Sequence, residues 1–175
     1  ATMITAAIVG LSPAQFVTAL RGTLRQIRLP LITTMLIVGL AYLMNYSGIA
    51  YTLGVGVASA GFLFPLLSAF LGWLAVFLSG SDTSGNALFG NLQVVAARQL
   101  DLSPILMAAT NASGGVMGKM ISPQNIVTGT STTNLRGREG EVLARTFKHS
   151  IILTLLLGVI VMLQQYVFPG MIPAG

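Results

Sequence analysis

Long apolar runs separated by short polar stretches dominate this chain. Two runs without a charged residue cover 31–51 and 150–168. Each is about as long as the roughly 20 residues that an α-helix needs to cross the hydrocarbon core of a bilayer. The pattern therefore predicts transmembrane helices over both runs.

The segment 12–28 has a different pattern, with apolar side chains on one helical face and arginines on another. Ser12 and Pro13 form a typical helix start, with serine as the cap and proline at the first helical position. The arginines are Arg21, Arg25 and Arg28. We expect an amphipathic helix in the membrane interface, with its arginines toward the lipid headgroups. A helix packed on a soluble core is the alternative.

Two polar breaks interrupt the remaining apolar sequence. The first polar break, 79–86, reads Ser-Gly-Ser-Asp-Thr-Ser-Gly-Asn, and the second polar break, 119–125, reads Lys-Met-Ile-Ser-Pro-Gln-Asn. The first divides 62–100 into two apolar arms. In the second, Pro123 interrupts the helical pattern of 104–135, because proline lacks the backbone N–H that an inner helical turn needs. We predict a re-entrant hairpin over 62–100 and a broken transmembrane helix over 104–135.

The distribution of charge constrains how these segments cross the membrane. Basic residues cluster over 21–28 and over 136–148, and both clusters should be cytoplasmic by the positive-inside rule. An even number of crossings must then separate them, which a hairpin over 62–100 allows. Two full crossings over the same residues also allow it, but the second apolar arm, 87–100, is short for a crossing.

Composition places the whole chain, 1–175, in one membrane domain. It is 54% hydrophobic and only 7% charged, whereas an average soluble domain has about 25% charged residues. The net charge of +5 lies mostly in the two basic clusters, so it indicates membrane orientation and not nucleic-acid binding. With no cysteine, one histidine and four acidic residues, we expect no metal centre and no cofactor. The expected fold is an all-α integral membrane protein, in which transmembrane helices accompany one re-entrant hairpin and one discontinuous helix.

The two polar breaks are where we expect binding chemistry, because irregular backbone at membrane depth is tolerated only beside protein or a water-filled cavity. The N-termini of half-helices can hold an anionic substrate there. The predicted substrate-binding residues are Ser81, Asp82, Thr83, Asn86, Lys119, Ser122, Gln124 and Asn125. Burial favours the neutral form of a carboxyl group, so Asp82 could carry a coupled proton, and Lys119 could pair with a substrate carboxylate. Two ordinary aqueous loops, or a purely structural ion pair, are the alternatives.

Two long runs, Gly80-Ser-Asp-Thr-Ser-Gly-Asn-Ala-Leu-Phe89 and Asn111-Ala-Ser-Gly-Gly-Val-Met-Gly-Lys-Met-Ile-Ser-Pro-Gln-Asn-Ile126, resemble the L-lactate permease family. Phe147-Lys-His-Ser-Ile151, which leads into the last span, is similar to that family too. The resemblance implies a multi-pass protein of the bacterial cytoplasmic (inner) membrane that imports lactate or glycolate, and this import is thought to be coupled to protons. Members of the family are much longer, so the chain resembles their C-terminal part and an N-terminal half is expected to accompany it.

A weaker resemblance extends to the ion transporter superfamily, whose hairpin motif usually reads Ser-Asn-Thr. Asp82 stands at the asparagine position, which favours a proton over sodium. The leading interpretation is secondary active transport of lactate or a related small 2-hydroxy monocarboxylate (glycolate), by proton symport across the lipid bilayer. We do not expect an enzyme, because no nucleophile, base or metal cluster stands out. A membrane scaffold, or the anchor subunit of a membrane enzyme, is the alternative.

Overall fold

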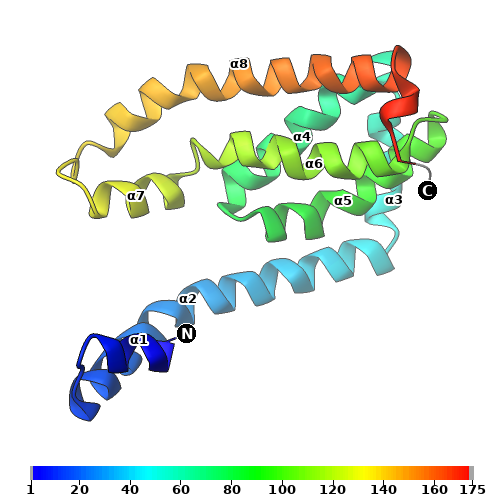
Figure 1. Cartoon of the computed structure of the whole chain (residues 1–175). Coiled ribbons are helices and arrows are strands. Elements are labelled where there is room, and N and C mark those ends of the chain that lie inside the picture. Colours follow the sequence, from blue (N-terminus) through cyan, green and yellow to red (C-terminus); the bar gives the residue numbers. More distant parts are fainter. Residues whose placement is uncertain (1, 174–175) are drawn as a thin grey trace. The chain divides into compact units, whose positions relative to one another are not determined.

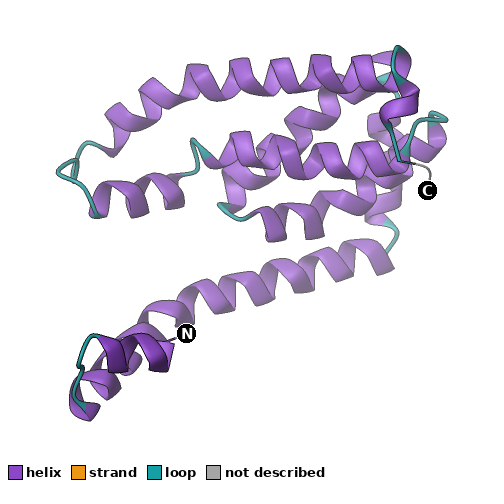
Figure 2. Cartoon of the chain, viewed as in Figure 1, coloured by secondary structure: helices purple, strands orange, loops and turns teal. Residues whose placement is uncertain are grey.

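The structure, a computed structural model, describes residues 2–173. This part of the chain contains helices and no strand (Figure 1, Figure 2). The α-helices are α1 (Thr2–Ile8), α2 (Pro13–Tyr46), α3 (Ile49–Ala58), α4 (Phe64–Ser79), α5 (Asp82–Gln99), α6 (Pro104–Lys119), α7 (Pro123–Ser131) and α8 (Glu139–Tyr166). Short 3-10 helices cover Gly61–Leu63 and Pro169–Met171. The expected all-α fold is confirmed.

The chain divides into two compact units, Ala1–Leu36 and Ile37–Gly175, and α2 contributes to both. In the first unit, Gln15 N–H donates to Ser12 Oγ at 3.3 Å, and Ser12 N–H donates to Gln15 Oε1 at 2.9 Å. This reciprocal pair is a capping box, which satisfies backbone donors at the start of a helix. The helix therefore begins where the sequence predicts.

Helix α2 joins two segments that the sequence pattern treats as separate. The expected interfacial helix 12–28 and most of the expected span 31–51 lie in one helix, which ends at Tyr46. Gly48 follows in the left-handed conformation, with a φ of 78°, which glycine adopts without steric cost. The chain bends there by 75° into α3. The helix thus ends five residues before the expected boundary. Its last part, Met35–Tyr46, and α3 have the geometry of a broken span or a re-entrant loop.

Helix α4 is central to the second unit, where it contacts α5, α6 and α8 (Figure 1). It crosses α6 at glycines. A Cβ added to Gly114 would overlap the carbonyl oxygen of Ala69, and one added to Gly118 would overlap that of Trp73. Small residues let membrane helices approach this closely. Neither position has room for a larger side chain unless the helices move apart.

The outer surface of the second unit is strongly apolar. On α8 alone, the exposed large hydrophobic side chains include Ile152, Leu155, Leu156 and Ile160. Soluble monomers rarely expose contiguous apolar patches of this kind. Among the described residues, two helical segments, Gly61–Ser79 and Glu139–Tyr166, are long and apolar enough to cross a membrane. This surface is suited to contact with lipid or with further protein.

The first polar break is more helical than its composition predicts. Ser81 caps α5, with Ser84 N–H donating to Ser81 Oγ at 3.4 Å, so the helix begins at Asp82 and not at residue 87. The second arm therefore has 18 residues, or about 27 Å at 1.5 Å per residue. The expected short arm is wrong, and arm length no longer distinguishes a hairpin from two crossings.

Contacts between α4 and α8 show where the turn between α4 and α5 lies along α8. Gly158 on α8 faces Leu66 near the start of α4, and Trp73 Nε1 donates to Ser150 Oγ at 2.7 Å one to two turns before the end of α4. The two helices are therefore antiparallel, and the turn lies toward the charged N-terminal part of α8. How deep the turn sits in a membrane stays a prediction.

Candidate functional site

The two polar breaks meet at the turn between α4 and α5. Asn125 Nδ2 donates to the carbonyl oxygen of Gly80 at 3.0 Å. A Cβ added to Gly80 would lie 2.6 Å from Gln124 Oε1 and 2.9 Å from Ser122 Oγ. Gly80 also has a φ of 70°, so both its conformation and its surroundings require glycine. We call this meeting point the break junction; it comprises Gly80, Asp82, Lys119, Ser122, Gln124 and Asn125.

Asp82 and Lys119 form an ion pair across the break junction. Lys119 Nζ lies 3.4 Å from Asp82 Oδ2, and the two side chains are 45% and 31% exposed, respectively. Asp82 Oδ1 is buried and has no hydrogen-bond partner, the one such side-chain atom in the described part of the chain. Gly115 makes room for it, since a Cβ added there would lie 2.6 Å from Oδ1. A buried oxygen without a donor is costly, so Oδ1 is a natural position for a proton or a ligand donor.

The other predicted site residues occupy different positions around the break junction. Ser81 caps α5, and Thr83 is exposed on the first turn of that helix. Ser122 is buried at the start of α7, but its side chain makes no capping hydrogen bond. Gln124 is exposed beside the turn, whereas Asn86 is half-buried and faces α6. That these residues bind a substrate stays a prediction.

A buried amide network, which the sequence analysis missed, adjoins the break junction. Ser68 Oγ donates to Gln93 Oε1, while Gln93 Nε2 donates to Ser68 O at 3.2 Å and to Asn111 Oδ1 at 2.6 Å. Asn111 Nδ2 donates to Asn86 Oδ1 at 2.6 Å and to Gly85 O at 3.4 Å. Ser68, Gln93 and Asn111 are almost fully buried. The available signal was the presence of amide side chains inside apolar helices, since such groups need partners at membrane depth.

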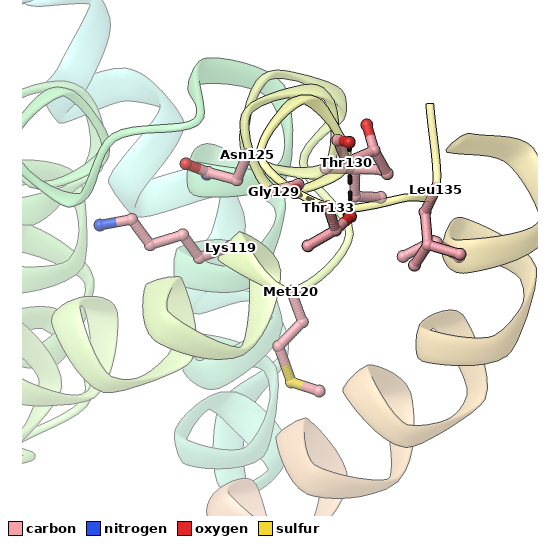
Figure 3. A pocket seen from close by; sticks show the side chains of 9 residues that line it. Lys119, Met120, Asn125, Gly129, Thr130, Thr133 and Leu135 are labelled. Carbon is pink, nitrogen blue, oxygen red and sulfur yellow. Dashed lines mark hydrogen bonds between the residues drawn. The ribbon is translucent and has the colours of Figure 1, made fainter. Parts of the chain in front are cut away.

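A pocket of about 310 Å³ opens beside the break junction, between the end of α6, α7 and the start of α8 (Figure 3). Its lining residues are Lys119, Met120, Asn125, Ile126, Gly129, Thr130, Thr133, Leu135 and Val142. Figure 3 shows Lys119 and Asn125 extending their polar ends in the same direction, while Met120 turns to another side. The volume is about ten times the ~30 Å³ share of one water molecule in the liquid. A small organic molecule would therefore have room in this pocket, whose lining is mostly apolar, and Lys119 directs its ammonium group away from the other labelled lining residues (Figure 3).

The fold and the break junction together define a class of protein. The described residues form an α-helical membrane protein whose apolar helices are interrupted at two polar sites that meet. Discontinuous helices of this kind are how secondary transporters build substrate and ion sites within the membrane.

Comparison with known proteins gives the family. The chain matches the L-lactate permease family over residues 1–168 and therefore belongs to it. It is 44% identical over 172 residues to the glycolate permease of Escherichia coli (strain K12), an alignment that covers 98% of this chain and 31% of that relative. It is 47% identical over 156 residues to the L-lactate permease of Bacillus subtilis (strain 168), covering 89% of this chain and 28% of the relative.

A further relative, the L-lactate permease of Salmonella typhi, is 45% identical over 163 residues, covering 93% of this chain and 30% of the relative. The chain thus spans less than a third of the length of these curated relatives. No solved structure matches the chain.

Proposed function

We propose that this chain is the C-terminal part of a secondary transporter that carries lactate, glycolate or a related small 2-hydroxy monocarboxylate across the bacterial cytoplasmic membrane together with a proton. Relatives named L-lactate permease and glycolate permease support the choice of substrate. The single observation that carries the proposal is the meeting of the two polar breaks around Asp82 and Lys119. An N-terminal portion of the multi-pass transporter would complete the site, since the chain spans less than a third of its relatives.

The break junction offers groups for both ends of a 2-hydroxy acid. The ammonium group of Lys119 suits the carboxylate, because hydrogen bonds between charged groups are shorter and stronger than neutral ones. The N-terminus of α7, which begins next to Ser122, adds partial positive charge on the same side. Asn125 donates with Nδ2 to Gly80 O, so its Oδ1 remains for the substrate hydroxyl. A carboxylate next to a hydroxyl would thus be distinguished from a plain carboxylate.

The Asp82–Lys119 pair links the proton to the anion. While Asp82 is ionised, it holds Lys119 at 3.4 Å. A proton on Asp82 removes the charge that attracts Lys119, and the ammonium group can then bind the substrate carboxylate. One proton and one anion enter together, so the net charge of the site is the same before and after loading. Such a cycle responds to the pH gradient and not to the membrane potential.

Transport by the complete permease in proteoliposomes tests this proposal. We expect radiolabelled L-lactate and glycolate to accumulate when the lumen is more alkaline than the outside, and this accumulation should collapse with the pH gradient. Unlabelled 2-hydroxy acids should compete better than acetate, which lacks the hydroxyl. Protein-free liposomes are the control. Failure to take up either acid would contradict the proposed substrate, and accumulation driven by a sodium gradient alone would contradict the proposed coupling.

A further inference from the structure

We propose that the amide network fixes the orientation of Asn86, so that Asn86 Nδ2 is presented as a hydrogen-bond donor to the substrate carboxylate. Ser68, Gln93 and Asn111 are then positioning residues, which act through Asn86 and do not touch the substrate. This inference rests on the proposed function, because it gives one more site residue a defined role toward the same anion.

The orientation of the amide side chains is set by Ser68, at the buried end of the network. A primary amide has an oxygen that only accepts and an NH2 group that only donates, and these two ends have nearly the same shape. Their assignment therefore depends on the partners. The carbonyl oxygen of Ser68 can only accept, and it lies 3.2 Å from Gln93 Nε2. Gln93 must therefore turn its NH2 group toward this carbonyl, with Oε1 toward the hydroxyl of Ser68.

The orientation of Gln93 determines the orientation of Asn111. Gln93 Nε2 places its second hydrogen on Asn111, so the end of Asn111 that faces Gln93 must be Oδ1, at 2.6 Å. The NH2 group of Asn111 then faces the other way, where it meets Gly85 O at 3.4 Å. This second backbone carbonyl is also an acceptor only, so it independently requires the same orientation. Two fixed carbonyl groups thus hold both buried amides in one direction.

Asn86 is the last member of the network, and it is half-buried, whereas Gln93 and Asn111 are buried. Asn111 Nδ2 donates to it, so Asn86 must offer Oδ1 inward, at 2.6 Å. Its NH2 group consequently points away from the network, and it makes no hydrogen bond to any other described residue. Asn86 Nδ2 is also absent from the buried polar atoms that lack a partner, so it remains accessible. Asn86 follows Asp82 by one helical turn on the same face of α5, which places a free donor beside the ion pair.

The burial of the network makes this orientation rigid. Gln93 is 0% exposed and Asn111 is 1% exposed, so no water competes for their hydrogen bonds. Turning Asn86 alone would bring two NH2 groups together. Turning all three amides would set the side-chain oxygens of Gln93 and Asn111 against the fixed carbonyl oxygens of Ser68 and Gly85. Either change leaves buried polar groups unpaired, which is the costly case. A preorganised donor binds an anion without the entropic cost of ordering it first.

Replacing Asn111 by aspartate tests the orientation directly. The substitution Asn111→Asp keeps the shape of the side chain, and its ionised form offers acceptors only. Because burial favours the neutral form of a carboxyl group, affinities are compared at increasingly alkaline pH, and the effect should appear as the new carboxyl group ionises. Gln93 can still donate to it, whereas Asn86 must turn its own NH2 group inward and expose Oδ1. We expect the affinity of the purified permease for glycolate, measured by calorimetry, to fall by about tenfold or more, as for a lost hydrogen bond to a charged group. The affinity for the neutral analogue glycolamide should fall much less, because its NH2 group can donate to the exposed oxygen.

The double variant, Asn111→Asp with Asn86→Ala, distinguishes a change in the orientation of Asn86 from a general structural defect. In the natural background, Asn86→Ala should weaken glycolate binding, because it removes a donor. In the Asn111→Asp background, the same substitution should strengthen glycolate binding, because it removes an oxygen that repels the carboxylate. A purely structural network predicts instead that the double variant binds no better than Asn111→Asp. That result, or an equal loss of glycolate and glycolamide affinity in Asn111→Asp, would overturn the proposal.

A matched control is available on α5, the helix that carries Asn86. Asn91 Nδ2 donates to Asn45 Oδ1 at 2.8 Å in an exposed amide pair, so Asn91→Asp makes the same chemical change outside the network. It should leave glycolate affinity unchanged. If Asn111→Asp fails to give a monodisperse protein, Gln93→Glu tests the same inversion from the next residue of the network. If the natural permease binds neither glycolate nor lactate, the proposed function fails. The orientation of Asn86 is then tested with the same variants on whichever of acetate, pyruvate or succinate binds, and on the corresponding amide.

Discussion

Lys119 Nζ lies 3.4 Å from one carboxylate oxygen of Asp82, while the other oxygen of Asp82 is buried without a partner. This asymmetry is unusual for an ion pair that serves only to stabilise a fold. Both side chains are partly exposed, and exposed pairs contribute only about 0–1 kcal/mol. An aspartate that keeps one oxygen unsatisfied gains little stability from the pair, but it is well placed to exchange its partner for a proton.

Asp82→Asn should abolish accumulation of substrate driven by a pH gradient and spare exchange of substrate across the membrane. Asparagine resembles the protonated carboxyl group, so Lys119 is permanently available to the anion, but no proton can be released. Radiolabelled uptake and counterflow in proteoliposomes measure the two activities separately. Asp101→Asn, at an exposed position after α5, is the control. Normal pH-driven accumulation by Asp82→Asn would make Asp82 a structural residue.

Lys119→Gln should raise the KM for glycolate by roughly 10- to 100-fold, the effect of losing a charge-assisted hydrogen bond. Its effect on the melting temperature should be small, because the lost ion pair is half-exposed and such pairs contribute little. Uptake kinetics and thermal unfolding of the purified permease measure the two quantities. Lys148→Gln removes an exposed cation from α8 and should leave KM unchanged. If both variants raise KM equally, Lys119 acts only through the general positive charge of the protein.

Gly115→Ala should damage the site directly, because Gly115 faces Asp82. The new Cβ would lie 2.6 Å from Asp82 Oδ1 and 2.6 Å from Val76 Cγ2, so Asp82 must move. We expect about 1–3 kcal/mol of destabilisation from overpacking and a marked loss of proton-driven uptake. Gly90→Ala, where a Cβ would meet nothing within 4 Å, is the matched control on α5. Its stability should stay the same or rise slightly, because alanine favours helix by up to about 1 kcal/mol. Equal effects of the two substitutions would contradict the close packing at Gly115.

Local signals in the sequence account for the helix starts and the close helix crossing. Ser103 caps α6 by accepting from Leu106 N–H at 3.2 Å, as its position before Pro104 indicates. The Gly114–Gly118 spacing predicts a close helix contact, and both glycines face carbonyl oxygens of α4. These features depend on residues only a few positions apart, so a single sequence contains the information needed to predict them.

Distant partners account for what the sequence pattern did not predict. Residues 82–86 look like a loop because they are polar, yet they belong to α5, and Asn86 has its partner on another helix, at Asn111. Gln93 is likewise paired with Ser68 on another helix. The sequence pattern also failed to place the end of α2, because Gly48 resembles any other glycine in an apolar run until its left-handed φ is known. Which polar residue meets which depends on how the helices pack, and periodicity does not contain that information.

The loop between α7 and α8 should be cytoplasmic, and the end of the chain beyond α8 should be outside. The reason is the basic cluster over 136–148, which the positive-inside rule places in the cytoplasm. We expect a cysteine in place of Arg138 to react with an impermeant maleimide only in inside-out vesicles. A cysteine in place of Met171, which is 67% exposed, should react only in intact cells. Labelling of both cysteines from the same side would contradict this orientation.

The turn between α4 and α5 should stay inside the protein and not emerge into the cytoplasm. Gly80 is buried against Gln124 and Ser122, which is expected for a re-entrant tip at a substrate site. The segment Gly61–Ser79, which includes α4, is nevertheless long and apolar enough to cross a membrane, and its end lies toward the charged part of α8. A cysteine in place of the exposed Thr83 distinguishes the two arrangements. For a hairpin, it should react with an impermeant maleimide far more slowly than a cysteine in place of Arg138, and glycolate should slow the reaction further. Rapid labelling from the cytoplasmic side without protection by glycolate would mean that α4 and α5 are two full crossings, and the break junction would then lie at the membrane surface.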